Sequence, residues 1–560
     1  MLPAPRRLLS ALLAATALSA AAVAPAAAGS SHALIQGSGS SWSSNAVNQW
    51  IADVQSDGLQ VVFTASGSAQ GRKDFAYKTT DYAVSDIGFQ GRDVGTGDVD
   101  SSQGRAFAYL PIVAGGTAFP YQIKVAGKLV RNLRLSGETL AKIFTNQITN
   151  WNDPQITKDN NGRALPSLAI VPVVHSEGSG STAQFTRYLD TQYPALWHAY
   201  YGQSGLTEYY PNKGSQIAQN GSDGVINFVT SGAGNGAIGY DEYSYALGKN
   251  YPVVKLENVA GYFTAPTQYN TAVALTQAQI NMDKNSPDYL LQNLNPVYVD
   301  TDKRTYPMSS YSYMIIPTAS DDARMTTAKR QTLADFLYYS VCQGQAEMGP
   351  IGYSPLPINL VQASFEQVGK LKEADTGVDL TKRDVTTCHN PTFVAGQPKR
   401  NYLAEIAPMP PACDHSGAGP CTGNEGLVNG NPSGGKPTSN DRKGGGDGFG
   451  GPTGLAGTGS ATPGGGTRTA GQPQLPSGQP SLTSTGKVDP VTGQTLLAPA
   501  VAGGDPGSAG AEATAVNTAL AERSLGGTPA LIGSWAVLLL IIALAAPPLV
   551  ARRLRRGADS

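Results

Sequence analysis

A short glycine- and serine-rich loop, placed between a predicted strand and a predicted helix, most constrains how this chain folds. It runs from His175 to Thr182 and reads His-Ser-Glu-Gly-Ser-Gly-Ser-Thr. The β-branched run 169–174 predicts a buried strand before it, and the apolar spacing in 183–189 predicts a helix after it. Free N–H groups at a helix start, backed by the helix dipole, can bind an anion. An ordinary helix cap with a flexible turn is the plainer alternative.

The same order of elements occurs twice more, nearer the N-terminus. Gly/Ser loops at 37–42 and 65–71 each follow a predicted strand, and a helix is expected from about Ser44. A further predicted strand ends in the carboxylate of Asp86. Such repeats are typical of parallel α/β sheets, in which ligands bind at the carboxyl ends of the strands. We therefore expect these loops and Asp86 to converge in one cleft.

The two ends of the chain predict export and a membrane anchor. Two arginines, an apolar run and three alanines ending at Ala28 indicate a signal peptide over residues 1–28. Residues 530–551 form an apolar stretch of about 22 residues, long enough for one transmembrane helix. The basic tail 552–560 follows at once and is expected to stay in the cytoplasm. The body is then extracellular, tethered to the outer face of the cell membrane.

Composition divides the rest of the chain. The stretch 414–527 is rich in Gly, Pro, Ser and Thr and is expected to be a disordered stalk, because it cannot bury enough apolar surface. Nearly all tyrosines and tryptophans precede Tyr402, so the folded part covers about 33–400 and suits two lobes. The net charge of −1 and the absence of a basic cluster outside the tail argue against a nucleic-acid partner.

The chain has four cysteines, which in an exported protein favours disulfides. Three pairings are possible, and we favour Cys342 with Cys388 and Cys413 with Cys421, because the second pair closes a short loop. Histidines beside two of the cysteines raise zinc binding as an alternative, but their spacing fits no standard zinc motif. We expect neither a metal nor a cofactor.

Over residues 33–370 the chain resembles the PstS-type phosphate-binding proteins of bacterial ABC transporters. The loop 37–42, Gly-Ser-Gly-Ser-Ser-Trp, is similar to the family's Gly-Ala-Gly-Ala-Thr-Phe, and 175–181 to its Arg-x-Asp-Gly-Ser-Gly-Thr. Four further segments match the family in order and spacing: Gly67-Ser68, the strand end 83–86, 223–225 with 236–243, and 139–144 with 151–153.

The resemblance implies an α/β, two-lobed periplasmic-binding-protein-like (type II) fold with two crossover strands, near 108–113 and 306–316. Lobe one would comprise 33–112 plus 307–375, lobe two 113–306, and an extension with cysteines 376–413.

The resemblance also implies a phosphate site between the lobes. The residues carried over from lobe one are Ser41, Trp42, Ser68 and Asp86, and those from lobe two are Ser179, Gly180 and Ser181. Asp86 would accept the proton of hydrogen phosphate, whereas sulfate offers none and would be repelled.

His175 stands where the family has arginine, and Glu177 where it has aspartate. Arginine gives a permanent charge and a two-point grip, but histidine is cationic only part of the time. Four alternatives remain open: lower affinity, a substitute cation such as Arg72 or Lys73, a different ligand such as a phosphate ester or another oxyanion, or a scaffold that no longer binds anions. If His175 faces the anion and Glu177 bonds its other ring nitrogen, the pKa of His175 should rise above about 6.5.

The expected function is therefore that of a tethered solute receptor for phosphate or a related oxyanion, serving ABC transporter permease subunits or sensing. One alternative is a phosphate-ester hydrolase in which Ser179 or Ser181 pairs with His175. No Gly-x-Ser-x-Gly elbow supports that alternative. Another alternative is a structural or adhesive surface protein that keeps the fold without a ligand.

Overall fold

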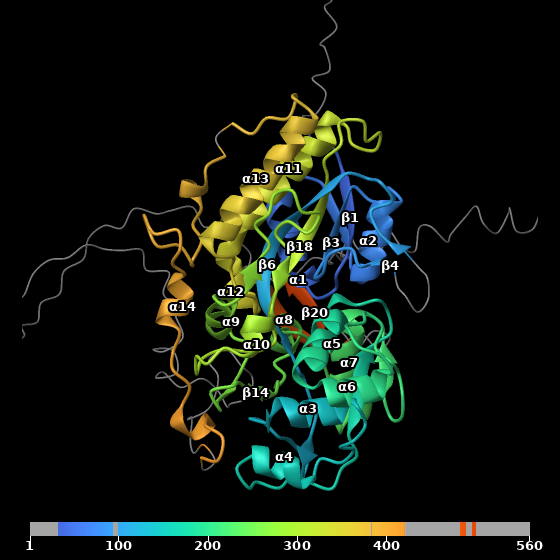
Figure 1. Ribbon diagram of the computed structural model, residues 1–560, viewed down its shortest axis with the longest axis vertical. Helices are drawn as coiled ribbons and strands as arrows, with labels where there is room; N and C mark the ends of the chain where they lie inside the picture. The colour runs from blue at the N-terminus through green and yellow to red at the C-terminus, as the bar shows by residue number, and fades with distance from the viewer. Residues whose placement is uncertain are drawn as a thin grey trace, which may run out of the picture. The chain divides into compact units, whose positions relative to one another are not determined.

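The computed structural model contains the predicted repeats of strand, Gly/Ser loop and helix (Figure 1). The structure describes residues 32–92, 99–381, 383–418, 421, 482–488 and 495–499. The three loops lead into α1 (Ser44–Gln55), α2 (Ser68–Ala76) and α5 (Gly180–Gln192), which confirms the helix expected from about Ser44. The strands before these loops are β1 (Ile35–Gly39), β2 (Val61–Thr64) and β10 (Val171–His175).

The largest sheet has six strands in the order β13-β6-β18-β3-β1-β2. In it, β1 runs parallel to β2 and to β3 (Tyr82–Ser85), as strand–loop–helix repeats require. Two long strands, β6 (Phe107–Ala118) and β18 (Ser309–Pro317), pair antiparallel along most of their length. The segments predicted to cross between lobes fall on these two strands. The short β13 (Asp241–Glu242) pairs with the far end of β6.

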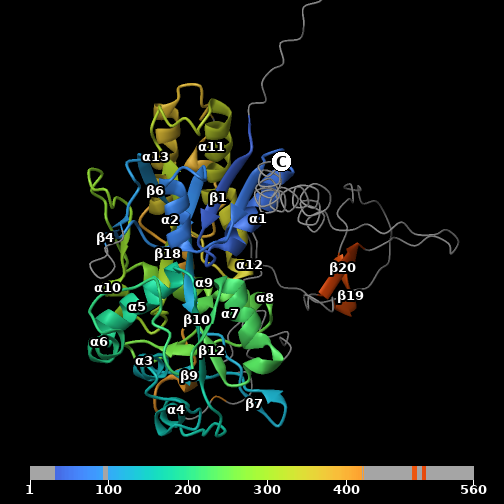
Figure 2. The same cartoon turned by 90° about the vertical axis from the view of Figure 1, so that its right-hand side faces the viewer.

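Helices lie against both faces of this sheet. α11 (Thr327–Val341) and α13 (Ile358–Ala374) lie side by side on one face, and α2 lies on the other (Figures 1 and 2). The apolar face of α1 is buried as its periodicity predicts, and the indole of Trp50 donates to the carbonyl of Gly344. This packing holds the first turns of α1 and α2 at the carboxyl ends of β1 and β2.

A second, parallel sheet carries the third loop. Its order is β11-β10-β12, with β11 (Ile217–Gln219) and β12 (Ala237–Gly239) on either side of β10. α7 (Gly221–Thr230) follows β11 and packs on β10. A third sheet, β15-β14-β9, joins Phe263–Thr264, Lys255–Glu257 and Arg134–Leu135.

The remaining elements are short connections and covering helices. The helices are α3 (Gly137–Phe144), α4 (Pro154–Asp159), α6 (Pro194–Tyr201), α8 (Tyr243–Gly248), α9 (Gln268–Leu275), α10 (Asn295–Tyr298) and α12 (Met348–Ile351). The strands are β4 (Gly91–Arg92), β5 (Val99–Asp100), β7 (Lys124–Val125), β8 (Lys128–Leu129), β16 (Gln279–Ile280) and β17 (Gln292–Asn293).

After α13 the chain continues as an extension, in which α14 (Tyr402–Ile406) packs on α9 (Figure 1). One disulfide joins Cys388 to Cys342 at the end of α11, and a second joins Cys413 to Cys421, so the favoured pairing is confirmed. Because every cysteine sulfur is bonded to another, the zinc alternative loses its ligands.

Folded chain reaches past residue 413, where the extension is predicted to end. Asp414, placed at the start of the stalk, is 1% exposed and binds Arg134 and Lys255, so folded chain continues beyond it. Within the expected stalk, β19 (Leu482–Val488) and β20 (Thr495–Pro499) pair antiparallel. This pair includes several of the few leucines and valines of the stretch, which explains why composition averaged over the whole stalk misses it.

The predicted signal peptide, transmembrane helix and basic tail lie outside the described residues. Among the helices that the structure describes, none is long and apolar enough to span a membrane.

Candidate functional site

Asp86, at the end of β3, lies at the centre of the candidate site. Its Oδ2 accepts hydrogen bonds from the hydroxyls of Ser40, at 2.7 Å, and Ser68, at 3.3 Å. Its Oδ1 accepts one from Ser312 on β18, at 2.7 Å. The residue is 2% exposed, and burial raises its pKa to about 6, against the opposing effect of these hydroxyls and of the charge on Arg72.

The first loop supplies Ser41 and Trp42 at the entrance to α1. The Oγ of Ser41 accepts hydrogen bonds from the N–H of Ser222, at 3.1 Å, and from its hydroxyl, at 2.9 Å. The indole of Trp42 is buried, where it donates to Thr117 and meets the ring of Tyr353 edge-on. Trp42 therefore offers the site its backbone, while its side chain anchors the loop.

The second loop enters α2 through a turn that requires glycine. Gly67 has a φ of 91°, and a Cβ there would lie 2.8 Å from the Glu177 side chain and 2.9 Å from the carbonyl oxygen of Gly178. The next residue, Ser68, both donates to the Asp86 carboxylate and accepts from the Asp86 N–H. The turn thus lets the loops of α2 and α5 approach each other closely.

The third loop brings Ser179, Gly180 and Ser181 to the same place. Ser179 caps α5 by accepting from the N–H of Thr182. A Cβ on Gly180 would lie only 2.2 Å from Oδ2 of Asp86, so the start of α5 abuts that carboxylate. The hydroxyl of Ser181 is buried without a partner among the described residues. A buried hydroxyl without a partner is costly, which marks this position as one that suits a ligand.

The start of α7 is tied to the first and third loops through Ser41 and Glu177, and the starts of α1, α2 and α5 meet around Asp86. Their first N–H groups have no acceptor within their own helix, and their dipoles add positive potential. The serine hydroxyls can donate as well. Such a constellation can hold an anion of several oxygens, and Asp86 can accept a proton that the anion carries.

His175 and Glu177 lie beside this cluster and bind each other. Nδ1 of His175 lies 2.7 Å from Oε1 of Glu177, and Nε2 lies 3.3 Å from the carbonyl oxygen of Tyr240. Burial acts to lower the pKa of His175, but the hydrogen bond and charge of Glu177 raise it overall, as expected. Since both ring nitrogens face acceptors, the imidazolium has no N–H left for an anion.

The pair instead links two loops of the site. Oε2 of Glu177 accepts the N–H of Gly221 at the start of α7, at 2.9 Å. His175 thus orients the carboxylate that holds α7 in place. Of the substitute cations, Arg72 is fully buried and donates to Ser85 next to Asp86, whereas Lys73 is exposed.

Several residues around Asp86 were not predicted from the sequence. Ser40 belongs to the recognised first loop and could have been found there. Ser312 and Gln184, which donates to the carbonyl of Asp86, lie far from it along the chain and carry no motif. Ser222, at the start of α7, directly precedes the segment 223–225 that matches the family. That match was the sequence feature that could have pointed to Ser222.

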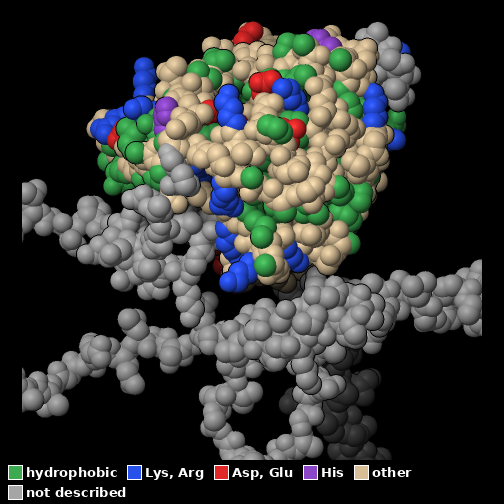
Figure 3. Space-filling model, turned by 90° about the horizontal axis from the view of Figure 1, so that it is seen from below, with side chains coloured by type: hydrophobic (Ala, Val, Ile, Leu, Met, Phe, Trp, Pro, Cys, Tyr) green, Lys and Arg blue, Asp and Glu red, His purple; other side chains and the backbone are tan. Residues whose placement is uncertain are grey.

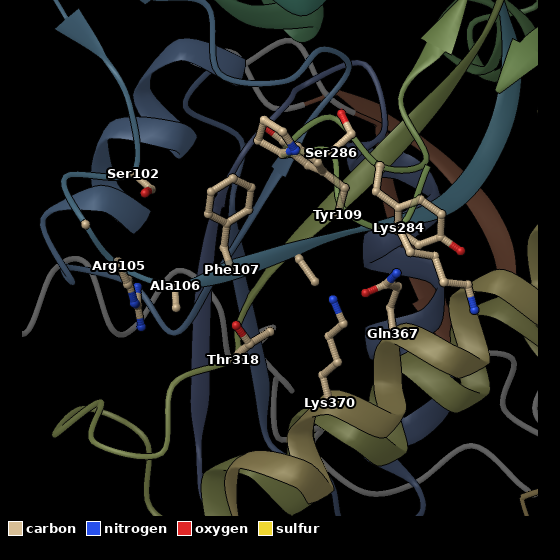
Figure 4. Close-up of a pocket in the computed structure, with 14 residues that line it drawn as sticks. Ser102, Arg105, Ala106, Phe107, Tyr109, Lys284, Ser286, Thr318, Gln367 and Lys370 are labelled. Atoms are coloured by element: carbon tan, nitrogen blue, oxygen red, sulfur yellow. The ribbon is translucent and has the colours of Figure 1, made fainter. Parts of the chain in front are cut away.

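A cavity of about 310 Å³ lies elsewhere and contains none of the predicted site residues (Figure 4). Its lining includes the aromatic side chains of Phe107, Tyr109 and Tyr289, together with Lys284, Gln367 and Lys370.

The surface seen at the end that carries α3 and α4 bears lysines and arginines separated by neutral and hydrophobic side chains (Figure 3).

A model of the PBP superfamily domain matches residues 24–343. The chain is 31% identical over 329 residues to phosphate-binding protein PstS 2 of Mycobacterium tuberculosis, which covers 58% of this chain and 83% of that protein. It is 30% identical over 332 residues to phosphate-binding protein PstS of Xylella fastidiosa, covering 59% of this chain and 83% of the relative. The chain belongs to the PstS-type family of the PBP superfamily.

Membership in the PstS-type family agrees with the α/β periplasmic-binding-protein-like fold described above. A solved structure of a high-affinity periplasmic phosphate-binding protein (PfluDING) is also similar, with 19% identity and a TM-score of 0.47, over 62% of this chain and all of that one. The family assignment rests on the sequence matches. Both curated relatives are named as phosphate-binding proteins.

Proposed function

We propose that this PstS-type chain binds inorganic phosphate, as hydrogen phosphate, between two lobes and delivers it to an ABC transporter. The observation that carries the proposal is the meeting of three helix starts and several serine hydroxyls around one buried carboxylate. The N–H groups of the helix starts and the unpartnered hydroxyl of Ser181 donate to the phosphate oxygens. Asp86, oriented by the hydroxyls of Ser40, Ser68 and Ser312, accepts the proton of the anion.

The residues that form the site are those expected from the family, with one change of role. Backbone and hydroxyl groups of Ser41, Trp42 and Ser68 act from lobe one, and those of Ser179, Gly180 and Ser181 from lobe two. His175 and Glu177 position the α5 and α7 loops rather than contacting phosphate, because their polar atoms already bind each other, Tyr240 and Gly221. The lobes are 33–112 plus 307–375 and 113–306.

Isothermal titration of the full chain with phosphate, sulfate and glycerol phosphate tests the proposal. We expect one phosphate per chain and at least tenfold weaker sulfate binding, because sulfate brings no proton to Asp86. Saturable binding of glycerol phosphate alone would redirect the site to phosphate esters. No heat with any of the three would favour a structural surface protein on this fold.

The chain is further proposed to be exported and held at the outer face of the membrane by a helix at 530–551. The support is the order of an N-terminal signal, an apolar stretch and an arginine-rich tail in the sequence. Protease added to intact cells should release a soluble binding fragment by cutting between residues 422 and 527. Protection of the whole chain until the cells are lysed would contradict this topology.

A further inference from the structure

Arg72 and Glu208 form a buried ion pair across the proposed cleft. Arg72 lies on α2 and is 0% exposed, and Glu208 lies in the loop between α6 and β11. Nη2 of the guanidinium lies 2.5 Å from Oε2 of Glu208. The pair therefore joins the part of the chain that carries Asp86 to the part that carries the α5 loop.

The arginine is held in place from its own side of the cleft. Its Nε donates to Asp100 on β5 at 2.9 Å, and its Nη1 donates to the hydroxyl of Ser85 at 2.9 Å. Ser85 directly precedes Asp86. Because two partners already orient the guanidinium, Glu208 meets a donor whose conformation is set in advance, which lowers the entropic cost of the bond.

Glu208 is in turn fastened to the loop that caps α5. Its carbonyl oxygen accepts the N–H of Ser179 at 3.0 Å. The neighbouring Thr207 is bonded to the side chain of Thr186 on α5 through both of its backbone groups. The Thr186 hydroxyl donates to the carbonyl of Thr207 at 2.8 Å and accepts the N–H of Thr207 at 3.0 Å. A movement of Glu208 relative to Arg72 would therefore move the start of α5 relative to Asp86.

Two other hydrogen bonds link the α2 and Asp86 region to α5 and its loop, and both join neutral groups. Ala69 donates its N–H to the carbonyl of Gly178 at 3.1 Å, and Gln184 donates to the carbonyl of Asp86 at 2.8 Å. Charge-assisted bonds are shorter and stronger than such neutral bonds. The ion pair is thus the contact whose loss should affect closure most.

We propose that the Arg72–Glu208 pair is the clasp of the closed state, which holds the α5 loop against Asp86 and slows the release of the bound anion. The inference rests on the proposed function for its ligand, and it assigns to these residues a positioning role without contact to the anion. Opening leaves Arg72 with Asp100 and Ser85, so the clasp can release without stranding a buried cation.

Phosphate binding by Glu208→Gln distinguishes the clasp from a simple effect of charge, because the two predict opposite changes. Removing a negative charge near an anion site should by itself tighten phosphate binding, whereas weakening the clasp should loosen it. We expect the phosphate dissociation rate of the full chain, measured by stopped flow, to rise roughly tenfold or more. Arg72→Gln should act in the same direction. The double variant should lose less than the product of the two single effects.

Asp322→Asn is the matched control. Asp322 binds Arg105 through a 2.7 Å bond in which both side chains are 1% exposed, but the two residues belong to the same proposed lobe. That variant should lower the unfolding temperature and leave the phosphate dissociation rate unchanged. Tighter phosphate binding by Glu208→Gln, or equal dissociation rates in Glu208→Gln and wild type, would overturn the clasp.

A second readout keeps the clasp testable if wild type does not bind phosphate. Spin labels at Lys73→Cys and Lys158→Cys, both exposed positions, report the distance between the lobes without any ligand. Absence of phosphate binding by wild type would reject the proposed function alone. Glu208→Gln should then lengthen the distance between the labels, and an unchanged distance distribution would reject the clasp.

Discussion

Asp86 and Asp414 are both carboxylates withdrawn from water, yet their surroundings differ in kind. Asp414 is 1% exposed and receives bonds from two cations, Arg134, at 2.6 Å, and Lys255, at 2.7 Å. Asp86 is 2% exposed and receives serine hydroxyls. Two cations more than neutralise one carboxylate and make an anchor for the extension. Hydroxyls compensate only partly, so Asp86 keeps a raised pKa and the capacity to take a proton.

The two regions also differ in the source of the positive charge that meets the carboxylate. The anchor joins the third sheet, through Arg134 and Lys255, to the end of the extension. The site relies mainly on neutral donors, which are the helix starts and hydroxyls. The ion pairs Arg72–Glu208 and His175–Glu177 lie beside it and do not include Asp86. An anion enters such a site without displacing a carboxylate from a cation, which is an arrangement suited to reversible binding.

Breaking the anchor should have the largest effect. Asp414→Asn leaves two buried cations without a counter-charge, and we expect the free energy of unfolding to fall by about 3–5 kcal/mol. Phosphate affinity should stay within a few-fold of wild type, because the anchor lies outside the site. Urea unfolding and titration measure the two quantities. Asp302→Asn, in a partly exposed pair with Arg304, is the control and should cost about 1 kcal/mol or less.

The raised pKa of Asp86 predicts the next effect, on stability against pH. A folded-state pKa of about 6, above the ordinary 3.8, means that the native state binds the proton more tightly than the unfolded state. The stability that Asp86 contributes is therefore full below pH 3.8 and is lost as the pH rises to about 6. The loss should be on the order of 3 kcal/mol, without phosphate present.

The difference in unfolding free energy between wild type and Asp86→Asn isolates this contribution. Asp241, whose pKa burial raises to about 7, titrates in both proteins and cancels. If the difference in unfolding free energy stays constant from pH 4 to pH 7, the pKa of Asp86 is not raised by folding.

Asp86→Asn should also change the selectivity between anions. An amide can donate to an oxygen that the carboxylate would repel, so sulfate binding should improve relative to phosphate. We expect the ratio of the two dissociation constants to shift by roughly tenfold, measured by titration at one pH. Ser56→Ala, on the exposed end of α1, is a neutral control. An unchanged ratio would remove Asp86 as the proton acceptor.

The smallest expected effect concerns His175. Its raised pKa means that the imidazolium bonds to Glu177 and Tyr240 are present below about pH 6.5 and are lost as the pH rises through the raised value. Relative to His175→Arg, which stays charged, wild type should lose phosphate affinity a few-fold between mildly acidic and mildly alkaline pH. The two proteins should be most alike at the acid end.

His198→Arg serves as the control for that comparison. His198 pairs with Asp190 at 2.7 Å, but its side chain is 41% exposed, and Asp190 lies near the end of α5 opposite the Gly/Ser loop. Its substitution should leave the pH dependence of affinity unchanged. Parallel affinity curves for wild type and His175→Arg would mean that the charge of His175 does not hold the site together.

Much of the fold and half of the site could be predicted from local patterns. The helix at Ser44, the strand that ends at Asp86 and the cap at Ser179 follow from periodicity and from small residues at strand ends. The contacts of Ser312, Gln184 and Glu208 could not, because each depends on a strand or loop brought in from a distant part of the chain. The contact between Nε2 of His175 and the carbonyl oxygen of Tyr240 also could not be predicted, because Tyr240 lies on a separate segment of the chain.

By itself, the sequence determined which loops could receive an anion and which family the chain belongs to, because glycine, serine and helix-start patterns act over a few residues. Tertiary structure alone decided which charges are compensated. Burial and the distance between groups set the pKa of Asp86, pair Arg72 with Glu208 and place two cations on Asp414. Electrostatic energies depend on solvent exclusion and separation in space, and neither quantity is written in the order of residues.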